Sequence, residues 1–114
     1  MNHTAMRIAV VGAGPAGLAL ALLAARLLPQ AQVTLFDARP AERDVSADPR
    51  TLALALGSVQ LLQRLAAWPA AQAVPILEVQ VSQAAPSLPA DWAESEVRIS
   101  AAEMGVPLLG AVLA

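Results

Sequence analysis

The first apolar run of the chain, residues 8–11, is short and uncharged, and a glycine-rich turn follows it directly. An alanine- and leucine-rich stretch comes next, residues 16–28, and its length favours a helix over a strand. Residues 32–36 are rich in β-branched and aromatic side chains, as is typical of strands. The pattern therefore predicts a buried strand, a glycine turn, a helix and a second strand, in that order.

The apolar positions that follow the charged loop at residues 37–49 predict a second helix. A short apolar segment, residues 51–56, precedes Ser58, which we expect to cap the start of this helix. Its apolar face is formed by three leucines, Leu61, Leu62 and Leu65. Residues 70–74 are expected to add a further helical turn.

The pattern changes again after residue 75, where apolar and polar residues alternate. Residues 76–82 are expected to form a half-buried strand, and residues 97–100 a short strand after a long loop at 83–96. We expect the two strands to form an antiparallel hairpin rather than another strand–helix–strand unit. Residues 101–105 are expected to form a turn.

The glycine turn has the form Gly12-x-Gly14-x-x-Gly17 between the first strand and the helix. Gly12 allows a tight turn, Gly14 lets a pyrophosphate approach the backbone, and Gly17 lets the helix pack closely on the strand. The first N–H groups of the helix lack intrahelical acceptors and attract an anion. The alternative is a plain strand-to-helix turn, which rarely needs three glycines.

Asp37 ends the second strand, about 20 residues after Gly17, where an acid can accept the ribose hydroxyls of an adenosine. A turn-capping role in Asp37-Ala-Arg-Pro40 is the alternative. Arg39 and Arg50 are candidate phosphate contacts because cations near a dinucleotide meet its phosphates. Glu42 and Arg43 are expected to be solvated.

Composition narrows the range of functions. The net charge is −2 and no basic patch is present, which argues against nucleic acid as a partner. The chain has no cysteine, and its one histidine, His3, lies near the N-terminus, so we expect no metal site and no catalytic residue within this chain. Any chemistry is expected to come from a cofactor or from residues outside this chain.

The uncharged run 8–25 after Arg7 raises a second alternative, a signal peptide or a membrane span. Its glycines, Pro15 and the strand and acid that follow argue against this alternative. Only one strand–helix–strand unit is evident, and residues 105–114 are apolar. We therefore expect residues 1–114 to be the N-terminal part of an incomplete FAD/NAD(P)-binding domain, with no second complete domain.

Four stretches resemble the N-terminal part of the flavin-dependent aromatic hydroxylases of ubiquinone biosynthesis, and most closely the bacterial 2-octaprenyl-6-methoxyphenol hydroxylase type. These are Val10-Val-Gly-Ala-Gly-Pro-Ala-Gly-Leu-Ala-Leu-Ala21, Asp48-Pro-Arg-Thr-Leu-Ala-Leu54 with Gly57-Ser-Val-Gln-Leu-Leu62, Pro75-Ile-Leu-Glu-Val-Gln-Val-Ser82 and Ala101-Ala-Glu-Met-Gly-Val-Pro-Leu-Leu-Gly110. The glycine motif is shared by many nucleotide-binding enzymes, whereas the stretch that begins at Asp48 is more specific.

The resemblance implies an α/β, Rossmann-like FAD-binding domain of p-hydroxybenzoate-hydroxylase type, truncated, with an antiparallel strand pair after the first βαβ unit. It implies FAD as cofactor, NAD(P)H as reductant and O₂-dependent hydroxylation of a polyprenyl phenol. It also implies a cytoplasmic protein peripheral at the inner membrane, in a ubiquinone-biosynthesis complex or a homo-oligomer. The cofactor-binding residues are then Gly12, Ala13, Gly14, Pro15, Ala16, Gly17, Asp37, Arg39 and Arg50.

The chain departs from the family in three respects. Position 37 is more often glutamate in flavoproteins, the loop after Ser82 is longer, and the later Gly-Asp stretch of the family is not present. We therefore expect no catalysis by these 114 residues alone. Two other interpretations stay open: an NAD-dependent dehydrogenase domain, and a non-catalytic remnant that keeps a nucleotide-binding fold.

Overall fold

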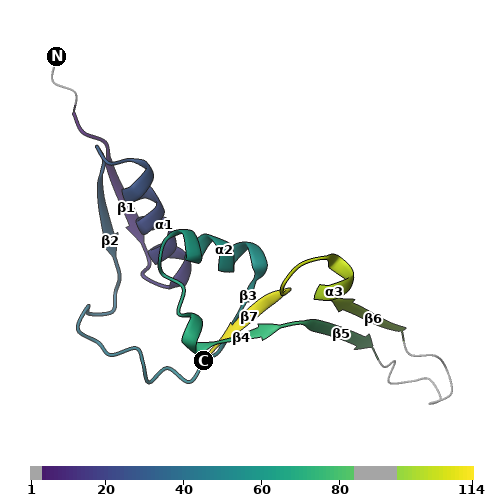
Figure 1. The fold of residues 1–114 in the computed structure, drawn as a ribbon. Helices are drawn as coiled ribbons and strands as arrows, with labels where there is room; N and C mark the ends of the chain where they lie inside the picture. The colour runs from purple at the N-terminus through teal and green to yellow at the C-terminus, as the bar shows by residue number, and fades with distance from the viewer. Residues whose placement is uncertain (1–3, 84–94) are drawn as a thin grey trace. The chain divides into compact units, whose positions relative to one another are not determined.

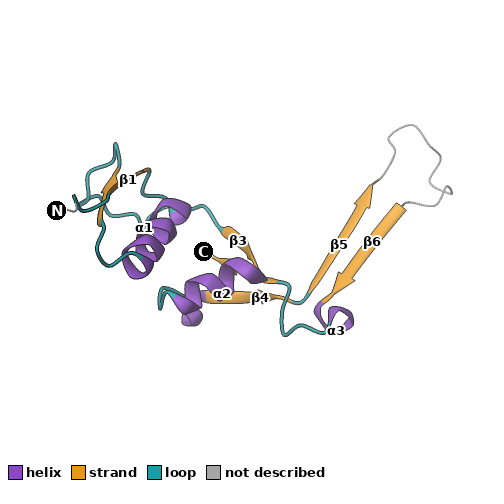
Figure 2. Cartoon of the chain, turned by 90° about the horizontal axis from the view of Figure 1, so that it is seen from above, coloured by secondary structure: helices purple, strands orange, loops and turns teal. Residues whose placement is uncertain are grey.

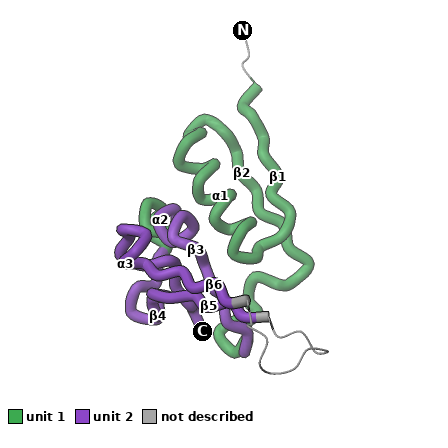
Figure 3. The backbone as a smooth tube through the Cα atoms, turned by 90° about the vertical axis from the view of Figure 1, so that its right-hand side faces the viewer, with its two compact units in different colours: residues 1–48, 62–67 green, residues 49–61, 68–114 purple. Residues whose placement is uncertain are grey.

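The computed structural model describes residues 4–83 and 95–114. The chain divides into two compact units, residues 1–48 with 62–67, and residues 49–61 with 68–114 (Figure 3). The elements are β1 (Arg7–Val11), α1 (Pro15–Leu27), β2 (Gln32–Phe36), β3 (Leu52–Ala55), α2 (Leu56–Arg64), the 3₁₀ helix η1 (Ala70–Gln72), β4 (Ala73–Ile76), β5 (Glu78–Gln83), β6 (Ser95–Ser100), α3 (Ala101–Met104) and β7 (Gly110–Leu113).

The first unit is built on a parallel pair of strands. β1 pairs with β2 from Arg7 opposite Gln32 to Val11 opposite Phe36, and α1 connects the two strands and packs on them (Figure 1). The predicted strand–helix–strand order is confirmed. The helix begins at Pro15, one residue earlier than predicted, because proline has no N–H to leave unpaired at the first helical position.

Few side chains of the first unit are fully buried among the described residues. Val10 of β1 is only 6% exposed, and Leu65, just beyond α2, is 4% exposed. The Arg26 guanidinium of α1 donates to the carbonyl oxygens of Arg64 and Leu65, both at 2.8 Å. The end of α2 is therefore held against α1 by one side chain.

The second unit contains a three-stranded antiparallel sheet in the order β3-β7-β4. β7 is the middle strand and pairs with both neighbours, with Ala111 opposite Leu54 on one side and Pro75 on the other. Ala111 is only 2% exposed. The apolar stretch 105–114 thus supplies the centre of a sheet, a role that the sequence pattern did not predict.

One prediction in this unit is wrong and another holds only in part. Ser58 does not cap α2, because the helix begins at Leu56, directly after β3, where the Leu56 N–H donates to the Leu109 carbonyl oxygen at 3.0 Å. The helical turn predicted for residues 70–74 ends at Gln72. Ala73 and Val74 belong to β4 because they pair with β7, which lies far along the sequence.

The predicted hairpin is confirmed, with a shifted boundary. The single strand predicted at 76–82 divides at Leu77 into β4 and β5, and β5 pairs antiparallel with β6 (Figure 2). The predicted turn at 101–105 is the short helix α3, which the Ser100 side chain caps by accepting from the Glu103 N–H. The middle of the predicted loop and its residues Asp91 and Glu94, and also His3, lie outside the described residues.

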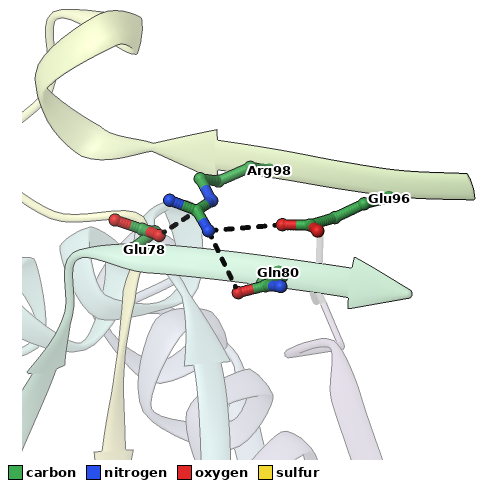
Figure 4. Close-up of polar contacts among 4 residues, drawn as sticks. All are labelled: Glu78, Gln80, Glu96 and Arg98. Atoms are coloured by element: carbon green, nitrogen blue, oxygen red, sulfur yellow. Dashed lines mark hydrogen bonds and ion pairs between the residues drawn. The ribbon is translucent and has the colours of Figure 1, made fainter. Parts of the chain in front are cut away.

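One face of the hairpin is apolar and the other is charged. Val79 lies opposite Ile99 and Val81 opposite Val97, and these four side chains are 38–57% exposed, not half-buried as predicted. A two-stranded ribbon has no second layer of its own to cover a face. On the other face Arg98 contacts Glu78 at 3.3 Å, Glu96 at 3.2 Å and Gln80 at 3.4 Å (Figure 4).

The membrane-span alternative concerned residues 8–25. In the structure these residues form a strand, a turn and part of α1, which has 13 residues. Within residues 4–83 and 95–114, no helix has the length and apolar character needed to span a bilayer.

Candidate cofactor-binding site

The candidate site is the turn between β1 and α1. Gly12 adopts φ +106°, a conformation that L-residues with a Cβ rarely take. Its N–H donates to the carbonyl oxygen of Phe36 at 2.7 Å, which continues the β1–β2 pairing one step beyond the strand. The turn is thus fixed to the end of β2 by its first residue.

The other two glycines of the motif have different surroundings. A Cβ on Gly17 would overlap the carbonyl oxygen of Gly12, so the helix can lie this close to the turn only with glycine there. A Cβ on Gly14 would meet nothing within 4 Å. Gly14 therefore faces open space, which a ligand phosphate could enter.

The start of α1 offers N–H donors to that open space. Gly14 is the N-cap residue, no side chain caps the helix, and the first intrahelical bond runs from the Leu18 N–H to the Gly14 carbonyl at 2.9 Å. Since Pro15 has no N–H, the backbone N–H groups of Ala16 and Gly17 are those without intrahelical acceptors. Together with the helix dipole, they favour an anion at this position.

Asp37 follows β2 and contacts the glycine turn. Its Oδ2 accepts from the Ala13 N–H at 2.8 Å, and its Oδ1 accepts from the Arg39 N–H at 2.9 Å. The N–H groups of Arg39 and Ala13 stabilise the carboxylate and hold the pKa of Asp37 below its ordinary value of 3.8, and the Arg39 charge adds to this. Asp37 is therefore ionised at neutral pH and close to the turn, as its predicted role requires.

The two predicted arginines are placed differently. The Arg39 guanidinium lies 3.8 Å from Oδ2 of Asp37 with its side chain 34% exposed, so the structure brings it to the same site. Arg50 belongs to the second unit, and its contact with the cofactor stays a prediction. The structure thus gathers the residues from Gly12 to Gly17, with Asp37 and Arg39, around one turn.

A separate hollow lies at the opposite end of β1. It has a volume of about 420 Å³. It is lined by Thr4, Ala5, Met6, Leu27, Leu28, Pro29, Gln30 and Ala31. These residues precede β1 or lie at the end of α1 and in the loop that follows it, whereas the glycine turn follows β1, so the hollow is distinct from the candidate site.

Among residues 4–83 and 95–114, no three metal-ligating side chains are grouped closely enough to hold a metal ion. The site described above offers backbone N–H donors, one carboxylate and one guanidinium, which suit a nucleotide.

The comparison with protein families agrees with this geometry. Residues 10–41 match the family described as the NAD(P)-binding Rossmann-like domain. They include the glycine turn, α1, β2 and Asp37. No curated protein matches the chain. The fold and the site therefore define a Rossmann-like nucleotide-binding unit of the kind found in oxidoreductases.

Sequence reasoning identified the motif but missed one contact that shapes the site and one contact at the other end of α1. The first is the bond between Asp37 and the Ala13 N–H, which depends on the register of β1 and β2. The second is the attachment of Arg26 to the end of α2. A single cation in the last turn of an otherwise apolar helix was the available signal for Arg26.

Proposed function

We propose that this chain is the N-terminal FAD-binding part of a flavin-dependent aromatic-ring monooxygenase. The observation that carries the proposal is the open glycine turn at the start of α1 with the Asp37 carboxylate beside it. A dinucleotide needs both features, a backbone cradle for its pyrophosphate and an acid for its adenosine ribose.

In this proposal the N–H groups of Ala16 and Gly17 bind the pyrophosphate, which approaches over Gly14. Asp37 accepts from the ribose hydroxyls, and Arg39 and Arg50 provide positive charge near the phosphates. The residues present fit such a group, since Gly14 leaves room and the helix start has no side-chain cap.

Two observations favour FAD and a hydroxylase over other dinucleotide enzymes. The stretch from Asp48 to Leu54 resembles the hydroxylases. In addition, β4 pairs antiparallel with β7 and β5 with β6, as expected for an antiparallel segment inserted after the first strand–helix–strand unit. When bound and reduced by NAD(P)H, FAD supplies the O₂-dependent hydroxylation chemistry. The contribution of this chain is to bind and orient the adenosine half of the cofactor.

The proposal extends to the whole protein. The substrate is a polyprenyl phenol, which places the protein in the cytoplasm, peripheral at the inner membrane. The protein works within a biosynthetic complex or as a homo-oligomer.

The second candidate function is an NAD-dependent dehydrogenase domain, and the match of residues 10–41 to an NAD(P)-binding family favours it. Asp37 would suit the ribose of NAD equally well. A non-catalytic remnant that retains nucleotide binding is the third candidate. In that case the chain binds a dinucleotide but takes no part in flavin chemistry.

A titration with FAD and with NAD separates the first two functions. We expect saturable binding of FAD, followed by flavin fluorescence, with NAD a weak competitor. Asp37→Ala should weaken the FAD affinity about tenfold or more, the value of one hydrogen bond to a charged group. Glu42→Ala, an exposed acid in the same loop, is the matched control and should bind as the wild type does. Preference for NAD would overturn the monooxygenase proposal.

A further inference from the structure

The position of Asp37 suggests a second role besides contact with the ribose. Two consecutive backbone N–H groups of the glycine turn are bound by the end of β2. Gly12 donates to the main-chain carbonyl of Phe36, and Ala13 donates to the Asp37 side chain. The Asp37 carboxylate thus takes the place of the next main-chain acceptor along the strand.

The conformation of Gly12 explains why a side chain is needed there. Its φ of +106° ends the regular strand geometry, so the Ala13 N–H no longer lies on the β1–β2 ladder. An N–H donor without an acceptor would cost free energy unless water reached it. Asp37 Oδ2, at 2.8 Å, is the acceptor that the structure supplies.

The carboxylate is itself held in place. Its Oδ1 accepts from the Arg39 N–H at 2.9 Å, and the Arg39 guanidinium lies 3.8 Å from Oδ2. The carboxylate has about four acceptor positions in all, and the backbone N–H groups of Ala13, Arg39 and, as the weakest of the three, Ala38 take up at most three of them, which leaves a position for a ribose hydroxyl. Binding the turn and binding a ribose are therefore compatible.

We propose that Asp37 is a positioning residue that fixes the glycine turn in its phosphate-binding conformation before any nucleotide arrives. The ligand part of this inference rests on the proposed function, whereas the contact between Asp37 and Ala13 does not. Preorganisation of this kind raises affinity because the turn does not have to be ordered on binding.

A ligand without ribose hydroxyls separates the two roles of Asp37. ADP and 2′,3′-dideoxy-ADP carry the same phosphates, but only ADP can donate ribose hydroxyls to the carboxylate. If Asp37 acts only through the ribose, Asp37→Ala leaves the affinity for dideoxy-ADP unchanged. We expect instead that Asp37→Ala lowers the affinity for dideoxy-ADP about fivefold and the affinity for ADP more than tenfold. An unchanged affinity for dideoxy-ADP would overturn the inference.

Asp37→Asn is the conservative variant for this test. Its amide oxygen can still accept from the Ala13 N–H, so it should restore most of the dideoxy-ADP affinity that the alanine variant loses. Equal loss in both variants would contradict a role through the turn. Asp44→Ala, which removes another loop carboxylate that binds a backbone N–H, is the control and should change neither affinity.

A measurement without any ligand completes the experiment. In NMR spectra of the 114-residue chain, the Ala13 amide proton should shift as Asp37 is protonated, and should exchange faster with solvent in Asp37→Ala. Within residues 4–83 and 95–114, the charged group beside this carboxylate is the Arg39 guanidinium. If the chemical shift of the Ala13 amide proton did not change as Asp37 is protonated, the inference would be refuted. If neither ADP nor FAD binds, the proposed function fails, and the amide measurement still decides the role of Asp37.

Discussion

Gly14 and Gly17 belong to one motif, and the structure predicts opposite consequences for the same substitution at each. Gly17→Ala places a Cβ against the Gly12 carbonyl oxygen, a backbone atom fixed by the hydrogen bond from the Gly12 N–H. Overpacking of this kind costs about 1–3 kcal/mol, and replacing a helical glycine by alanine returns at most about 1 kcal/mol. Because the Cβ would meet backbone, which cannot easily move aside, the overpacking cost lies at the upper end of this range. The net loss in the free energy of unfolding is then about 2 kcal/mol.

Gly14→Ala should leave the fold almost unchanged. The new Cβ meets nothing within 4 Å, and φ −74° suits any residue. The poorer N-cap propensity of alanine and its lower unfolded-state entropy nearly cancel, within about 0.5 kcal/mol. The Cβ does occupy the space where a phosphate would approach. We therefore expect FAD affinity to fall about tenfold or more, which corresponds to about 1.4 kcal/mol.

Urea unfolding followed by circular dichroism and flavin titration together separate the two effects. For a slope of about 2 kcal/mol per molar, Gly17→Ala should lower the urea midpoint by about 1 M, or abolish a cooperative transition. Gly14→Ala should keep the midpoint of the wild type and lose binding. Equal midpoints for the wild type and Gly17→Ala would refute the packing argument. A Gly14 variant that binds FAD normally would refute the assigned path of the phosphate.

Three further predictions test other contacts. Arg26→Met should lower the free energy of unfolding by about 1–2 kcal/mol, measured in urea, because two carbonyl oxygens at the end of α2 lose their donor. The pKa of Asp37 in the folded state lies below 3.8, so the contribution of its carboxylate to stability is complete above that pH. This contribution is lost as the pH falls through the folded-state pKa. Asp37→Asn should therefore remove this part of the acid dependence of the urea midpoint. Arg98→Met should change the melting temperature little, because its contacts on the hairpin are exposed and such pairs contribute about 0–1 kcal/mol; a loss well beyond that would show that the charged face has a larger structural role.

The first unit could be predicted almost residue by residue, because its signals are local. Apolar runs of strand and helix length surround a glycine motif, and Gly12 and Gly17 occupy the strained and crowded positions that the motif indicates. Asp37 was placed correctly by its distance along the sequence from the glycines. Its bond to Ala13 was not predictable, since it depends on how β2 lies beside β1.

The second unit was predicted less well because its strands pair with a distant segment. Nothing local marks Ala73 and Val74 as a strand, and they extend because β7 offers them a partner. Ser58 looked like an N-cap, but the chain passes from β3 into α2 without a loop. The hairpin of β5 and β6 was recognisable because alternation is a local signal, although its apolar face proved to be exposed.

The order of the sheet β3-β7-β4 also has a consequence for the synthesis of the protein on the ribosome. β7 pairs with both β3 and β4 and is the last of the three strands to be synthesised. β3 and β4 therefore emerge before their shared partner is available. Until β7 follows, their backbone edges and apolar side chains are open to other chains and to chaperones. β1, α1 and β2 follow one another in the chain, so the parallel pair β1–β2 can form before residues 62–67 emerge to complete the first unit. The nascent chain therefore forms its nucleotide-binding turn early. It is most prone to aggregation afterwards, while β3 and β4 are still unpaired.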